Sequence, residues 1–145
     1  MSAAGGCEPI PAGARVLVTG ATGFTGRVLM RQLAEAGADL RAIARGSSDL
    51  SPLAGLPVRW HRGDVFDPAV VRAAAEGAEY VFHVAALYRE ARHGDEMYRK
   101  VHVESTRLLA EALAGAPGFR RFVHVSTVGV HGHIEEPPAD ENYRF

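Results

Sequence analysis

Residues 16–26 read VLVTGATGFTG, an apolar run that breaks into three glycines at positions 20, 23 and 26. Residues 15–19 (RVLVT) are mainly apolar and β-branched without alternation, which is typical of a strand covered on both faces. Apolar residues then recur at helical spacing over residues 27–36, and Gly37 follows as a typical helix end. The stretch therefore predicts a buried strand that turns through glycines into a helix.

Strand and helix patterns keep alternating along the rest of the chain. Asp67 is a typical N-cap, and Pro68 suits the first position of the helix that follows it. Further strands are predicted at residues 40–44, 58–61, 80–85 and 121–126, and further helices at residues 68–76 and 94–114. This alternation predicts an α/β fold with a Rossmann-type doubly wound parallel sheet. Right-handed crossovers favour the strand order 3-2-1-4-5.

The composition indicates one soluble domain. The chain has 145 residues, 47% hydrophobic and 23% charged, and its net charge of -1 gives no reason to expect nucleic acid or an anionic membrane as partner. A single cysteine, Cys7, excludes an internal disulfide and suits the reducing cytosol. No apolar stretch approaches the ~20 residues of a membrane span, and residues 1–14 lack the layout of a signal peptide. We therefore expect a cytoplasmic protein.

The three glycines acquire a mechanism in the setting of a parallel sheet. Gly20 permits a tight turn out of the strand, Gly23 lets the backbone approach a pyrophosphate, and Gly26 lets the helix pack closely on the sheet. The free N–H groups of Phe24 and Thr25 at the helix N-terminus would attract the anion. A P-loop is a competing interpretation, but no Gly-Lys pair follows Gly20. A glycine-rich turn without a ligand stays open on spacing alone.

Several segments together resemble the extended short-chain dehydrogenase/reductase family, the NAD-dependent epimerase/dehydratase group. TGATGFTG resembles the family's TGxxGFxG signature. The matching segments that follow are GDVFD at 63–67, HVAA at 83–86, VHVESTRLLAEA at 101–112 and FVHVSTVGVHG at 122–132. RGSSDL at 45–50 and VFHVAALYRE at 81–90 resemble the dihydroflavonol-reductase-like and sugar-nucleotide-epimerase-like branch. The resemblance covers nearly all of residues 15–132.

This resemblance implies the NAD(P)-binding domain of an oxidoreductase or epimerase. Such an enzyme acts by hydride transfer on a carbonyl, alcohol or nucleotide-sugar substrate. Asp64 and the backbone of Val65 would hold the adenine, and Ala85 and Ala86 would lie beside the cofactor. Thr127 matches the family's catalytic hydroxyl and would hold a substrate oxygen near the nicotinamide.

Ser126 is the alternative to Thr127, and both hydroxyls could simply satisfy local backbone. Three positions depart from the family pattern: His102 replaces the usual asparagine, Ser105 a glycine, and His131 a tyrosine. For His102 the residues alone leave open a hydrogen bond in place of that asparagine or a place on the helix surface.

The family's catalytic YxxxK is absent from residues 1–145, since no lysine follows Tyr143. We therefore expect a flexible leader at residues 1–14, the cofactor-binding domain at residues 15–132, and a loop at 133–145 that leads to a missing C-terminal part. The chain alone would be inactive. The other hypothesis is a non-catalytic dinucleotide-binding module. An unpaired edge of strand five would favour association into a homo-oligomer.

Cofactor choice depends on the residues after the second strand. An acidic residue there binds the ribose 2′-OH of NAD, whereas an arginine accommodates the 2′-phosphate of NADP. The sequence has Arg45 and no acidic residue before Asp49, so we expect NADP, with NAD as the alternative. Arg45 as a solvated loop charge is the simpler interpretation.

The seven histidines do not predict a metal site. His131 and His133 form the closest pair, but no carboxylate or cysteine pattern completes a ligand set. His83 is expected to serve local structure near the cofactor rather than to act as a base. Tyr88 could line the substrate pocket, although a loop aromatic is the simpler interpretation.

Overall fold

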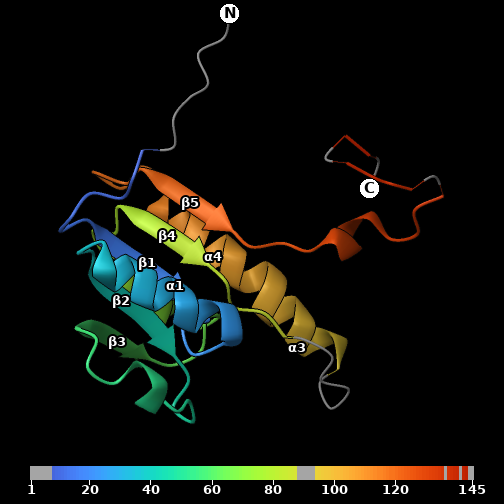
Figure 1. Ribbon diagram of the computed structural model, residues 1–145. Helices are drawn as coiled ribbons and strands as arrows, with labels where there is room; N and C mark the ends of the chain where they lie inside the picture. The colour runs from blue at the N-terminus through green and yellow to red at the C-terminus, as the bar shows by residue number, and fades with distance from the viewer. Residues whose placement is uncertain (1–7, 88–93, 136, 141, 144–145) are drawn as a thin grey trace, which may run out of the picture.

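The computed structural model describes residues 8–87, 94–135, 137–140 and 142–143. A parallel sheet of five strands forms its centre, in the order β3-β2-β1-β4-β5 (Figure 1). The strands are β1 Arg15–Thr19, β2 Asp39–Ala44, β3 Val58–Arg62, β4 Tyr80–His83 and β5 Arg121–His124. The predicted fold class and strand order are confirmed.

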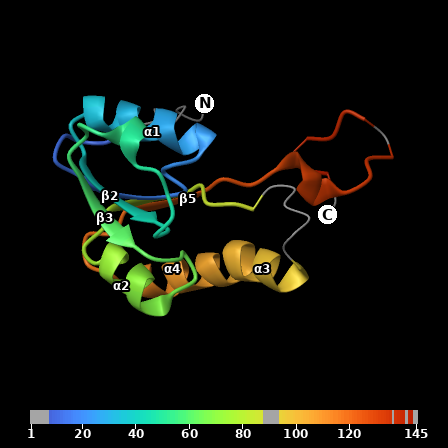
Figure 2. The ribbon, with the colours of Figure 1, turned by 90° about the horizontal axis from the view of Figure 1, so that it is seen from below.

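Helices cover both faces of the sheet (Figure 2). Helix α1, Phe24–Glu35, packs on one face, where Val16 and Val18 of β1 meet Met30 and Leu33. Helices α2, Pro68–Ala75, and α4, Ser105–Leu113, pack on the other face against Leu17. The residues of β1 thus alternate between two apolar cores, which explains why the strand reads as an uninterrupted apolar run.

The side chain of Asp67 caps α2 as predicted, accepting hydrogen bonds from the backbone N–H groups of Ala69 and Val70. Helix α1 begins at Phe24, three residues before the predicted start at 27. The side chain of Phe24 is 93% exposed, so the first turn of α1 carries no apolar face that a periodicity could reveal.

Strands β4 and β5 each end two residues before their predicted ends at 85 and 126. The backbone N–H of Ala85 donates to the side-chain oxygen of Thr19 at 3.2 Å instead of to a strand carbonyl. The ladder between β1 and β4 therefore stops where a side chain replaces the backbone partner.

The predicted helix over 94–114 is one helical run with an irregular middle. Helix α3 spans Asp95–Arg99, the segment η2 spans Lys100–Glu104, and α4 follows directly. At the end of η2 the N–H of Ser105 donates to the carbonyl of Lys100, five residues earlier, which is a π-type hydrogen bond. An apolar spacing of three and four does not distinguish such a turn from an ordinary helix.

Two short 3-10 helices complete the described elements. Ser51–Leu53 (η1) lies in the loop between β2 and β3, and Val128–His131 (η3) follows β5. In the part of the chain that the structure describes, no helix has the length and apolar character needed to cross a membrane.

Candidate functional site

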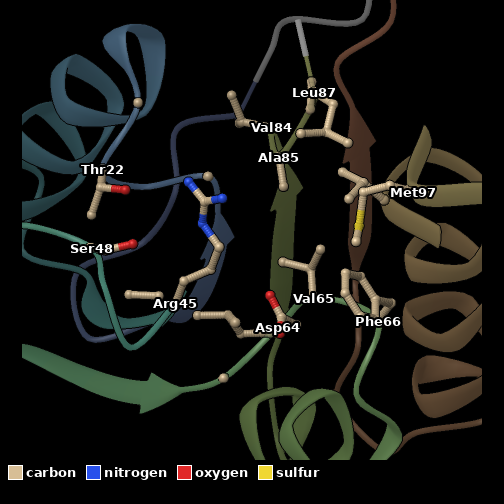
Figure 3. A pocket seen from close by; sticks show the side chains of 17 residues that line it. Thr22, Arg45, Ser48, Asp64, Val65, Phe66, Val84, Ala85, Leu87 and Met97 are labelled. Carbon is tan, nitrogen blue, oxygen red and sulfur yellow. The ribbon is translucent and has the colours of Figure 1, made fainter. Parts of the chain in front are cut away.

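A cavity of about 300 Å³ opens at the carboxyl ends of the strands (Figure 3). Its wall includes residues that directly follow β1, β2, β3 and β4. In the sheet, β2 lies on one side of β1 and β4 on the other, so β1 marks the point where the strand order reverses. Ligands of open α/β sheets bind at such a point, at the carboxyl ends of the strands.

The backbone of Gly20 lies too close to the end of β4 for any side chain. A Cβ on Gly20 would lie 2.7 Å from the backbone nitrogen of Ala85, and its φ of +70° is in the left-handed region. Glycine at this position therefore lets the turn after β1 rest directly on the chain that leaves β4. This contact adds to the tight turn that the sequence predicts.

Gly26 faces the same turn from inside α1. A Cβ there would lie 2.1 Å from the carbonyl oxygen of Gly20 and 2.8 Å from the Cα of Ala21. The helix can approach the turn only because this position has no side chain, which agrees with the predicted close packing. Gly26 is buried beneath the turn and does not line the cavity.

Gly23 is the N-cap of α1 and lines the cavity. The first N–H groups of α1 after it, those of Phe24 and Thr25, have no carbonyl partner within the helix. Neither of these two side chains lines the cavity, so any contribution from them is through the backbone. A glycine edge followed by free N–H groups is a site that fits an anion.

One side of the cavity is apolar. Val65 and Phe66 follow β3, and Leu87, Met97 and Val101 close the wall from the β4 side and from the helical run (Figure 3). Asp64 adds a carboxylate beside this apolar wall. Flat apolar groups with a polar edge, such as a purine base, suit such a surface.

The opposite side carries hydroxyls and a guanidinium. Arg45, Thr22 and Ser48 all line the cavity, and Figure 3 shows their polar ends turned toward one another. Asp49 does not line the cavity, because its carboxylate accepts hydrogen bonds from the N–H and hydroxyl of Ser51, each at 2.9 Å. These bonds lower the pKa of the Asp49 carboxyl. The groups that follow β2 therefore offer donors and positive charge.

A buried chain of hydrogen bonds lies behind the cavity. Ser105 donates its hydroxyl proton to the carbonyl of Val101, so its oxygen accepts from His83 Nε2 at 3.0 Å. Nδ1 of His83 then accepts from the hydroxyl of Thr19 at 2.6 Å, and that oxygen accepts from the N–H of Ala85. We assign this direction from the number of protons that each group carries. The chain ties the helical run to the cavity wall.

His83 is neutral in this arrangement. Only 1% of its surface is exposed, and burial, followed by the charges of His124 and His102, lowers its pKa to about 4. Both ring nitrogens are engaged in hydrogen bonds. The arrangement agrees with a structural role near the cavity and not with a general base.

His102 makes a hydrogen bond rather than only covering the helix surface. Its Nε2 accepts from the N–H of Leu87 at 3.2 Å and lies 3.3 Å from the carbonyl of the same residue. Its ring also stacks on Tyr98 with an interplanar angle of 11°. The histidine thus connects the helical run to the cavity-lining residue Leu87.

Of the predicted site residues, seven line the cavity and four do not, namely Phe24, Thr25, Gly26 and Thr127. Those that line the cavity are Gly20, Gly23, Arg45, Asp64, Val65, Ala85 and Ala86. Thr127 does not line it: the side chain is exposed, and its oxygen accepts from the N–H of Gly129 at 3.2 Å. Tyr88 lies outside the described residues.

Sequence reasoning missed Thr22 and the Thr19–His83–Ser105 contacts. A threonine between two glycines and a serine in place of a glycine are the only signals for them. Among the described residues, no group of three or more His, Cys, Asp or Glu side chains is placed to hold a metal ion.

Comparisons with known proteins identify relatives of the chain. The sequence is 40% identical over 129 residues to sterol demethylase protein B of Methylococcus capsulatus, which covers 88% of this chain and 38% of that protein. It is 38% identical over 130 residues to a protein provisionally named dihydroflavonol 4-reductase from Synechocystis sp., which covers 88% of this chain and 37% of that protein.

A solved structure agrees with these relatives. A short-chain dehydrogenase/reductase superfamily protein from Agrobacterium tumefaciens, with bound NAD, has 30% sequence identity and a TM-score of 0.75, and the match covers 90% of this chain and 38% of that chain. The chain thus spans about two fifths of the length of these relatives. Residues 16–144 match the family described as "NAD dependent epimerase/dehydratase family", whose members include reductases, epimerases and dehydratases. The chain belongs to this family, as its glycine turn and its strand ends predict.

Proposed function

We propose that residues 15–132 are the NADP-binding domain of a reductase or epimerase that acts on a carbonyl, alcohol or nucleotide-sugar substrate. The observation that carries the choice of NADP is the group formed by Arg45, Thr22 and Ser48 at one side of the cavity. Family membership and the neighbour with bound NAD support dinucleotide binding.

The 2′-phosphate of NADP suits these donors. A guanidinium binds a phosphate through two parallel charge-assisted hydrogen bonds, and the two hydroxyls supply further donors. NAD sites instead use a carboxylate for the ribose 2′-OH. The nearest carboxylate along the chain, that of Asp49, is turned to Ser51.

The rest of the cavity accommodates the other parts of a dinucleotide. The edge at Gly20 and Gly23, with the N–H groups of Phe24 and Thr25, would bind the pyrophosphate, and Gly26 keeps that turn against α1. Asp64 and Val65 would hold the adenine on one side, and Ala85 and Ala86 the other part of the cofactor near β4. When bound, the cofactor supplies hydride transfer.

Replacement of Arg45 tests the choice of cofactor. Arg45→Ala is expected to weaken NADPH binding by about 10- to 100-fold, because a charge-assisted bidentate contact is lost, and to leave NADH binding within about two-fold. Fluorescence titration of the purified protein with each dinucleotide measures both affinities. Tighter NADH than NADPH binding in the wild type, or an Arg45→Ala variant with unchanged NADPH affinity, would contradict the proposal.

Thr127 is proposed to hold the substrate oxygen by its hydroxyl proton. It follows β5 at the same edge of the sheet as the cavity, and its oxygen accepts from Gly129, which leaves the proton free to donate. In the longer enzyme of which these residues are proposed to be a domain, Thr127→Val is expected to lower kcat/KM at least about ten-fold in NADPH-dependent reduction of a panel of aldehydes and ketones.

The same variant should leave NADPH affinity unchanged, and Thr127→Ser should retain most of the activity because it keeps the hydroxyl. Full activity of Thr127→Val would contradict this role. If that longer wild-type protein binds NADPH but reduces nothing in the panel, the result would instead support a non-catalytic dinucleotide-binding module.

A further inference from the structure

Arg62, the last residue of β3, lies against the turn that follows β2. Its Nη1 donates to the carbonyl of Arg45 at 3.0 Å and lies 3.4 Å from the carbonyl of Ser48. The N–H of Ser48 donates to the same Arg45 carbonyl at 3.0 Å. One guanidinium therefore contacts both ends of a turn whose end residues, Arg45 and Ser48, both line the cavity.

Little else determines the shape of this turn. Arg45, Gly46 and Ser47 are exposed. Apart from Gly46 and its two chain neighbours, no heavy atom of the described residues lies within 4 Å of the place where a Cβ on Gly46 would lie. A turn without packed side chains keeps one conformation only through its hydrogen bonds. The register between β2 and β3 pairs Ala44 with Arg62, which sets the guanidinium beside the turn.

We infer that Arg62 is a positioning residue that determines dinucleotide specificity. By binding the two carbonyls, it holds residues 45–48 in the conformation that turns the Arg45 guanidinium and the Ser48 hydroxyl into the cavity. A turn that is ordered before the ligand binds loses less conformational entropy on binding, so the phosphate contacts become stronger. The inference depends on the proposed preference for NADP.

The positive charge of Arg62 offers a different explanation, direct attraction of the phosphate. Two substitutions separate these roles. Arg62→Gln removes the charge but keeps N–H donors for a carbonyl, whereas Arg62→Ala removes both. Arg59 supplies a matched control, because it is an exposed arginine on the same strand. In the register of the sheet it lies opposite Arg41 of β2, away from the turn.

The experiment is titration of the full protein with NADPH and with NADH. Arg62→Ala is expected to weaken NADPH binding about ten-fold with NADH binding within about two-fold, and Arg59→Ala to change neither by more than about two-fold. Arg62→Gln should keep most of the NADPH affinity. Because Arg62 acts through the turn, its loss should matter little once Arg45 is gone. The double variant Arg45→Ala/Arg62→Ala should bind NADPH no more than about three-fold more weakly than the single variant Arg45→Ala.

Three results would overturn the inference. The first is an NADPH affinity of Arg62→Ala equal to that of Arg59→Ala. The second is a double variant in which the losses of affinity from Arg45→Ala and Arg62→Ala multiply. The third is an Arg62→Gln variant that loses as much NADPH affinity as Arg62→Ala. If the wild type prefers NADPH and Arg45→Ala loses that preference, any of these results removes the role of Arg62 alone. A wild type that prefers NADH removes the NADP proposal and this inference together.

Discussion

Alanine in place of Gly26 is expected to lower the free energy of unfolding by about 4 kcal/mol or more, a large part of the stability of a domain of this size. The added Cβ would lie 2.1 Å from the carbonyl oxygen of Gly20. The backbone fixes the position of the Cβ, and the atom that it meets is a backbone oxygen. No side-chain rotation therefore relieves the contact, and α1 must move off the turn. The helix propensity of alanine, about 1 kcal/mol better than that of glycine, opposes only a fraction of this cost.

Gly46→Ala is the matched control for this prediction. Its Cβ would meet no atom of the described residues within 4 Å beyond its own chain neighbours, and its φ is not in the left-handed region. The free energy of unfolding of the variant should therefore lie within about 1 kcal/mol of the wild-type value. Urea unfolding followed by circular dichroism gives both values. If Gly26→Ala proved as stable as Gly46→Ala, the close contact between α1 and the glycine turn would be wrong.

The stability of the protein is expected to fall on acidification through the buried His83. Its imidazole has a pKa of about 4 in the folded protein against an ordinary value of 6.5. Between these two pH values the unfolded chain binds a proton that the folded protein does not, so the free energy of unfolding decreases as the pH falls from about 6.5 to 4. The full change is about 3 kcal/mol, and it ends below pH 4.

His83→Gln isolates this contribution. At pH 7.5 the variant is expected to be about 2 kcal/mol less stable, because the buried hydroxyls of Thr19 and Ser105 lose a partner. Toward pH 4 the difference in the free energy of unfolding between wild type and variant should vanish or change sign, since only the wild type carries the buried imidazole. Carboxylates with lowered pKa values, such as Glu79, are present in both proteins and cancel in the difference.

His133→Gln provides the control, because His133 is exposed and lies outside the buried chain of hydrogen bonds. It should follow the wild type at every pH. Parallel stability curves for the wild type and His83→Gln between pH 7.5 and 4.5 would rule out the proposed neutral, buried His83.

Local sequence patterns were sufficient to predict the sheet and the glycine turn. The run at residues 16–18 is apolar because both faces of β1 are covered, and Asp67 caps α2 through its own neighbours. Both patterns can be recognised from residues that are adjacent in the chain. The early start of α1 at Phe24 was missed for the complementary reason, because an exposed first turn leaves no apolar pattern.

The strand ends and the helical run show the limit of this reasoning. Residues 84 and 85 look like strand, but the Thr19 hydroxyl takes the N–H of Ala85 and ends the ladder there. The irregular turn before Ser105 likewise leaves the apolar spacing almost unchanged. At Ala85 a side chain from another strand takes a backbone N–H, and at Ser105 the residue's own hydroxyl donates to the carbonyl of Val101 in the preceding turn.

Short motifs identify parts of the site, because each motif carries its own backbone geometry. These parts are the glycine edge of the cavity, Asp64 and the residues after β4. The grouping of Thr22 with Arg45, the contact of Arg62 with the turn, and the partners of His83 cannot be identified in this way. Thr19 and His83 are 64 residues apart, and Arg62 and Arg45 are 17 apart. Those contacts exist because the parallel register of β1 with β4 and of β2 with β3 brings distant strand ends to one edge of the sheet.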